Sequence, residues 1–231
     1  MDSRDNSRPA SGVRGVFPAL IAVAAVLAVC AAPAGAQTFG QFTTAAVSPL
    51  GEGNVFFSAG DERLDIGVTG RFQLNERSDF GVQTAYSRAE EIDSWGLGID
   101  YKSYLIRGGS TVPVDLAGDL SYGFIRGGGF ARSVFILSVM SSGMIVTGEG
   151  IDFEPYGSVG FMGQWFHDKA RCGRGDSVPD SWPCEADDWE TDSGLILRGG
   201  VKTWLSEEIQ FCVELEYYEE VTAGGAFNVV F

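Results

Sequence analysis

The chain has little of what most metal-binding and catalytic sites are built from, with one histidine and four cysteines in 231 residues. The single histidine, His167, is not part of a Cys/His cluster, so no zinc-like spacing is present. The G-x-S-x-G signature of many serine hydrolases is also missing. The sequence therefore gives no reason to expect a cofactor or a bound metal ion.

Basic residues are scarce as well. Lysine and arginine number 16 against 31 aspartates and glutamates, and the formal net charge is -15. Because nucleic-acid binding depends on a basic surface, this balance excludes nucleic acid as an expected partner.

The one long apolar run stands at the amino terminus. Three arginines precede VFPALIAVAAVLAV, and the small-residue sequence Ala34-Gly35-Ala36 follows it. This is the layout of a cleaved secretory signal peptide. A membrane helix is the alternative, but the run is short and prolines interrupt it. We expect residues 1–36 to be a signal peptide, 37–52 a periplasmic lead segment, and 53–231 the folded domain of an exported protein.

From about residue 63 the chain alternates apolar and polar residues, with no competing helical period. In RLDIGVTGRFQL, Leu64, Ile66 and Val68 share one face of a strand, and Asp65 and Thr69 share the other. The alternation recurs in FGVQTAYSR, SWGLGIDYKSYL, VDLAGDLSYGF, LILRGGVKTWL and IQFCVELEYY. The uncharged stretch SVFILSVMSSGMIVTG is interpreted as a strand that is apolar on both faces. With a first strand at 53–60, we predict an all-β, antiparallel up-and-down barrel of ten strands, eight or twelve being the alternatives.

Alternation alone does not say whether the apolar face points inward, as in a soluble barrel, or outward into lipid. Three observations favour lipid. The strands are about ten to fourteen residues long, enough for a tilted strand to cross a bilayer. Connections at one end are short, and the longest, residues 167–192, falls at the other end, as in bacterial membrane barrels. Aromatic residues near strand ends suit interfacial girdles: Trp95, Tyr122, Trp165, Trp204, Tyr217, Phe227 and Phe231.

The terminal AFNVVF, the strand opening PYGSVGF and the stretch GGVKTWLSEEIQFCVELEYY resemble small Gram-negative outer-membrane β-barrel proteins of the OmpA/OmpX-like group. This resemblance covers most of the chain after residue 36 and speaks to fold and location more than to activity. It implies a place in the cell outer membrane, with lipid and lipopolysaccharide as partners. It also implies that Phe231 is part of the signal read by the barrel assembly machinery. We expect a monomer.

If the apolar face meets lipid, charged residues of both signs point into the lumen: Asp65, Arg71, Asp100, Lys102, Asp115, Asp119, Arg198, Lys202, Glu214 and Glu216. In a narrow barrel such residues can pair across the interior and close it. The acidic excess would instead suit a narrow, cation-preferring, porin-like channel. We favour a closed, salt-bridged lumen and a structural or surface-interaction role without enzymatic activity.

The long external loop contains Cys172 and Cys184, which we expect to form a disulfide in an oxidising compartment. Cys212 is then left alone, as a small buried side chain in the barrel wall. The acidic residues of this loop are interpreted as solvated, although they could gather a divalent cation together with lipopolysaccharide phosphates. His167 beside Asp168 is the sole candidate for a general base, and it makes an outer-membrane hydrolase a remote alternative.

Overall fold

In a computed structural model, the described residues are 42–47, 51–60, 63–89, 92–109, 113–127, 130–147, 152–168 and 189–231. The expected signal peptide lies outside them, as do Cys172 and Cys184. No helix in the described part of the chain is long and apolar enough to cross a membrane.

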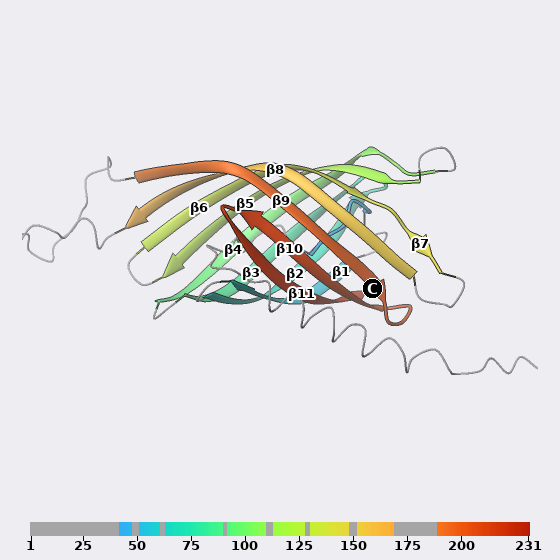
Figure 1. Cartoon of the computed structure of the whole chain (residues 1–231), viewed down its shortest axis with the longest axis horizontal. Helices are drawn as coiled ribbons and strands as arrows, with labels where there is room; N and C mark the ends of the chain where they lie inside the picture. The colour runs from blue at the N-terminus through green and yellow to red at the C-terminus, as the bar shows by residue number, and fades with distance from the viewer. Residues whose placement is uncertain are drawn as a thin grey trace, which may run out of the picture.

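The regular elements of the described residues are all β-strands (Figure 1). They are β1 (Gly51–Gly60), β2 (Arg63–Asn75), β3 (Ser78–Ala89), β4 (Ile92–Ile106), β5 (Asp115–Gly127), β6 (Phe130–Ser142), β7 (Ile145–Val146), β8 (Asp152–Asp168), β9 (Trp189–Trp204), β10 (Ile209–Tyr218) and β11 (Glu220–Val230). The first strand begins at Gly51, two residues before the position expected from the sequence. β8 and β9 also extend into both ends of the expected loop 167–192.

The sheet closes on itself. Apart from the short β7, each strand pairs antiparallel with the next one along the chain, so that β6 pairs with β8, and β1 pairs with β11. The two-residue β7 pairs only with the start of β8, so it is not a wall strand. The wall is therefore a closed barrel of ten antiparallel strands, which confirms the predicted fold class. Closure leaves no unpaired strand edge in the wall.

The two rims of the barrel differ. β1 begins and β11 ends at one rim, since Glu52 is in register with Val230, and we call this the terminal rim. The connections β2–β3, β4–β5, β6–β8 and β9–β10 join strands at the terminal rim. The longest connection, between β8 and β9, joins strands at the opposite rim. This is the arrangement expected from the spacing of the strands in the sequence.

Polarity across the wall is inverted relative to a soluble barrel. On β6, Leu137 faces outward and is 56% exposed, whereas its neighbour Ser138 faces inward and is 2% exposed. The same holds on β2, where Ile66 is exposed and Asp65 is fully buried. Because side chains alternate along a strand, the large apolar residues that share a face with Ile66 and Leu137 point outward.

The interior is not polar throughout. Val134, Ile136 and Met140 point inward from β6 while Leu137 and Val139 point outward, so β6 is apolar on both faces as expected. The stretch SVFILSVMSSGMIVTG is not one strand, however, since β6 ends at Ser142 and the separate β7 follows. The first two inward residues belong to a buried cluster on one inner wall, made of Ile125, Val134, Ile136, Met162, Ile196 and Tyr218. This cluster lies in the half of the barrel toward the opposite rim, because Ile125 and Tyr218 are close to the ends of β5 and β10.

Large inward aromatics lie over glycines of the neighbouring strand. Phe56 is in register with Gly67, and Tyr156 with Gly200. A Cβ atom added at Gly67 would lie 2.3 Å from the Phe56 ring and 2.6 Å from the carbonyl oxygen of Thr84. These glycines therefore leave the space that the rings fill.

Gly67→Ala is expected to lower the free energy of unfolding by about 1–3 kcal/mol, because the added methyl group overpacks the interior. Urea unfolding in lipid vesicles measures the effect. Gly53→Ala is the matched control, since the nearest atom to an added Cβ there is 3.7 Å away. Equal destabilisation by the two variants would contradict the assigned packing of Phe56.

Candidate functional site

Among the described residues, the charged side chains that interact most closely lie inside the barrel. On β2, β3 and β4, the Arg71 guanidinium pairs with the carboxylates of Asp79 and Asp100. The Lys102 ammonium lies 3.4 Å from the second carboxylate oxygen of Asp79. All four side chains are buried, so each charge depends on its partners in place of water.

Further pairs lie elsewhere on the wall, either within one strand or between strands. Arg198 Nε on β9 donates to Glu216 Oε2 on β10 at 2.7 Å, and Arg63 Nε donates to Asp65 Oδ1 at 2.8 Å. Lys202 Nζ lies 3.5 Å from Glu52 Oε2. The interior is thus held by several separate ion pairs on different parts of the wall.

Two more inward carboxylates accept hydrogen bonds from neutral groups. The Ser121 hydroxyl donates to Asp119 at 2.9 Å, and the Ser142 hydroxyl donates to Glu154 at 2.7 Å. A third, Glu214, accepts from the Tyr156 hydroxyl at 2.7 Å.

Residues 42–47 lie inside the barrel. Phe42, Thr44 and Ala45 are almost completely buried. The backbone N–H of Phe42 donates to Glu214, and Lys102 donates to oxygen atoms of this segment. Of the expected periplasmic lead segment 37–52, residues 42–47 lie in the lumen, because buried side chains of the wall hold their backbone, and Gly51 and Glu52 begin β1.

The residues expected in the lumen are placed as follows. Buried side chains on the inner face are Asp65, Arg71, Asp100, Lys102, Asp119, Arg198, Lys202, Glu214 and Glu216. Asp115 is different: it begins β5 at the terminal rim, is only half-buried, and accepts a hydrogen bond from the backbone N–H of Gly108 at 2.6 Å. Its carboxylate therefore holds the β4–β5 connection.

Sequence reasoning missed several interior groups. Glu52 lies in the segment expected to be the lead, and Asp79 lies between the alternating segments RLDIGVTGRFQL and FGVQTAYSR, outside both. Glu154 and Tyr156 stand at inward positions of β8, where the alternation is interrupted by glycines. For residues 42–47 the sequence carries no signal, since the segment FTTAAV has neither charge nor apolar alternation.

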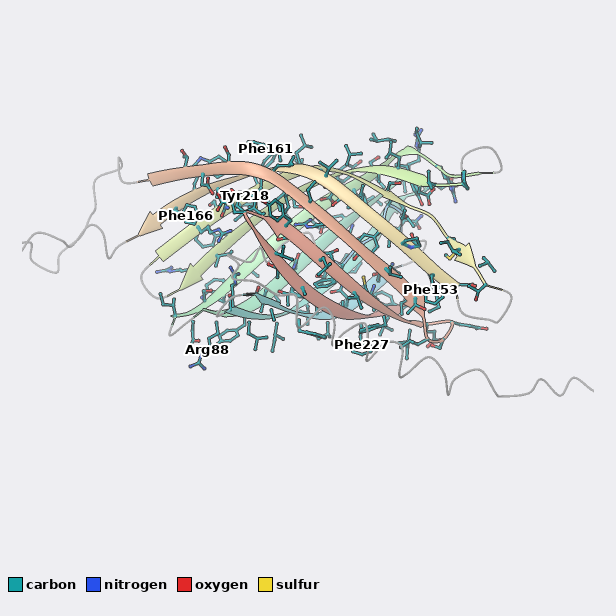
Figure 2. All side chains as sticks on the ribbon, in the orientation of Figure 1. Arg88, Phe153, Phe161, Phe166, Tyr218 and Phe227 are labelled. Carbon is teal, nitrogen blue, oxygen red and sulfur yellow. The ribbon has the colours of Figure 1, made fainter. Side chains whose placement is uncertain are left out.

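The expected girdle residues mostly face outward. Trp95, Trp165 and Tyr217 are exposed toward the opposite rim, and Phe227 and Phe231 are exposed at the terminal rim. Tyr122 is exposed but lies farther from a strand end, and Trp204 is half-buried. Figure 2 shows aromatic side chains at both ends of the wall, with Phe166 toward one end and Phe153 toward the other.

The described part of the chain contains few cysteine and histidine residues. Cys212 is a free, buried thiol with the Tyr156 hydroxyl 3.0 Å from its sulfur atom. The backbone of His167 lies near the end of β8, in register with Trp189. No group of three or more His, Cys, Asp or Glu side chains among the described residues is arranged to hold a metal ion.

What decides the environment of the wall is the combination of closure and inverted polarity. An outward band of Val, Leu, Ile and aromatic residues surrounds an interior of paired charges. In water this arrangement would expose the apolar face and bury the polar one; in a bilayer it satisfies both. The fold is that of an outer-membrane β-barrel.

Comparison with known proteins assigns the chain to no family. No protein-family model and no curated protein matches the chain. Among solved structures, the Acinetobacter baumannii outer membrane protein Omp33 is similar at 11% identity and a TM-score of 0.34, covering 80% of this chain and 99% of that one. LpxR from Salmonella typhimurium is similar at 8% identity and a TM-score of 0.39, covering 73% of each chain.

A third similar structure is the attachment invasion locus protein Ail of Yersinia pestis, in complex with a heparin analogue. Its identity is 11% and its TM-score 0.23, over 78% of this chain and 96% of that one. Similarities of this size say nothing about a shared activity.

Proposed function

We propose that this protein is a monomeric, non-enzymatic barrel of the outer membrane with a closed lumen and a structural or surface-interaction role. The observation that carries the proposal is the filled interior. Paired charges, residues 42–47 and the apolar cluster on the inner wall occupy it, and their side chains are buried. A solute path would have to separate buried charges from their partners, which is costly.

The same proposal names the partners of the outer surface. Lipid and lipopolysaccharide would cover the apolar wall and the aromatic residues at its rims. The barrel assembly machinery would read the C-terminal strand, and the outward positions of Phe227, Val229 and Phe231 at the end of the chain support that role. Residues of the expected external loop, with Cys172 and Cys184, would be the first surface met from outside the cell.

Purified protein in a planar lipid bilayer is expected to give no discrete current steps, because paired charges, residues 42–47 and the apolar cluster occupy the interior. Heat-modifiable migration on a gel, tested on an outer-membrane fraction and on the sample used for recording, checks location and folding. Reproducible ion steps from folded protein would overturn the closed lumen.

A narrow cation-preferring channel is the second candidate, and one observation favours it. The buried carboxylates of the described residues outnumber the buried cations: Glu52, Asp65, Asp79, Asp100, Asp119, Glu154, Glu214 and Glu216 against Arg71, Lys102, Arg198 and Lys202. If current steps were found, a reversal potential in a salt gradient that indicates cation selectivity would favour this candidate.

A further inference from the structure

Residues 42–47, which we call the inner segment, are held mainly through their backbone. Lys102 Nζ donates to the carbonyl oxygens of Thr44 and Ala46, both at 2.7 Å. At one end of the segment, Glu214 accepts from the backbone N–H of Phe42 at 3.0 Å. At the other, the Tyr104 hydroxyl accepts from the backbone N–H of Val47 at 2.9 Å. Contacts of this kind recognise a peptide chain with little regard to its sequence.

One side chain of the inner segment has a shaped pocket. The ring of Phe42 stacks on Phe56, with centroids 5.5 Å apart and planes at 29°. The rest of its buried cluster is Ala85, Tyr156, Cys212 and Ala226. Gly224 leaves the room for this ring, since a Cβ added there would lie 2.6 Å from Phe42 Cζ.

The backbone conformation of Phe42 also indicates that this residue fits closely into its pocket. Its φ is 59°, in the left-handed region that bulky residues rarely adopt. Such a conformation persists where the surrounding contacts determine it. Here those contacts are the hydrogen bond to Glu214 and the ring pocket.

We infer that the barrel interior contains a peptide-binding site for a short, irregular segment with a phenylalanine, and that the inner segment is its occupant in cis. The site lies between the middle of the barrel and the terminal rim, because Val47 contacts Tyr104 and β1 begins at that rim four residues later. Another peptide of this kind binds the site when the inner segment is displaced. This inference goes beyond the closed, structural barrel and is independent of its conductance.

The covalent connection explains why the wild-type protein is self-occupied. Residues 48–50 join the inner segment to β1. A short connection gives an effective concentration on the order of millimolar, so a free peptide at micromolar concentration competes poorly.

The test uses the full chain with Ala45→Arg. Ala45 is 0% exposed and packs against Ala117 and Met140, so an arginine side chain does not fit and the inner segment is displaced. The probe is the fluorescent peptide Phe-Thr-Thr-Ala-Ala-Val, acetylated so that the phenylalanine keeps an amide N–H, and its anisotropy is followed in detergent micelles. We expect binding to Ala45→Arg at least about tenfold tighter than to wild type.

Two matched comparisons assign the contacts. A peptide carrying Phe42→Ala is expected to bind about tenfold or more weakly, because a buried ring is lost. Adding Lys102→Met to Ala45→Arg removes the donor to the carbonyl oxygens and weakens binding of the original peptide. Adding Lys202→Met is the control, since this equally buried lysine pairs with Glu52 and does not touch the inner segment in the described contacts.

Heat-modifiable migration establishes folding of each variant. If Ala45→Arg does not fold, Phe42→Asp takes its place, because it removes the ring and sets a carboxylate beside Glu214. The inference is overturned if the folded, displaced variant binds the peptide no better than wild type or empty micelles do. It is also overturned if the Phe42→Ala peptide binds equally well.

Discussion

Replacing Arg71 with leucine is expected to lower the free energy of unfolding by about 3–5 kcal/mol, because two buried carboxylates lose their cation. Asp79 and Asp100 both pair with this guanidinium, and both are buried. Lys102 also lies near Asp79, but its ammonium donates to the inner segment. It does not replace the hydrogen bonds that the Arg71 guanidinium donates to the two carboxylates. Urea unfolding in lipid vesicles, followed by tryptophan fluorescence, measures the change.

The control is Arg88→Leu, which breaks an exposed pair. Arg88 and Asp93 are 3.8 Å apart, with side chains 64% and 60% exposed, so water replaces the partner at little cost. A second variant adds Asp100→Leu to Arg71→Leu, and it should recover part of the lost stability, because the remaining carboxylate, Asp79, keeps Lys102 as its partner at 3.4 Å. If Arg71→Leu were as mild as Arg88→Leu, the charge network would not be a structural element of the interior.

Leu137→Arg is expected to lower the free energy of unfolding in vesicles by about 2–4 kcal/mol, the cost of an arginine on the lipid face near the bilayer midplane. Leu137 lies near the middle of β6, between Leu120 of β5 and Phe161 of β8. All three side chains face outward and are exposed from the protein. An arginine there has no protein partner and has to reach the interface.

The control for this variant is an arginine at a different depth in the membrane. Leu205→Arg places the same charge in the β9–β10 connection at the terminal rim, where the expected cost falls to about 0–1 kcal/mol. Leu205 is 51% exposed, close to Leu137 in accessibility, so the two sites differ mainly in their distance from the rim. Equal costs at the two sites would mean that the wall is not immersed in lipid.

The wall of the barrel could be predicted from the sequence because it depends on a local rule. Alternation along β2 or β10 determines which residues share a face. An up-and-down barrel with both of its ends at one rim needs an even number of strands. This is why Asp65 and Glu216 could be assigned to the inner face from their neighbours alone. The apolar inner face of β6 could be predicted in the same way, since SVFILSVM has apolar residues at both odd and even positions.

The pairing of the interior charges could not be predicted, because it depends on register across strands. Arg71 meets Asp79 and Asp100 only through the alignment of β2, β3 and β4. Asp115 shares the parity of the inward residues but begins its strand, so it binds a connection at the rim. The inner segment was unpredictable for a different reason: its contacts come from a fully assembled wall, and its own residues carry no pattern.

The most direct test of the central claim is the accessibility of nitroxide spin labels on the wall, measured by electron paramagnetic resonance in lipid vesicles. A label introduced at Leu137 is expected to collide readily with oxygen, which concentrates in lipid, and hardly with a water-soluble nickel chelate. A label at Leu205 should show the reverse preference for the chelate. Ready collision of the Leu137 label with the chelate would contradict a lipid-facing wall and, with it, the outer-membrane barrel.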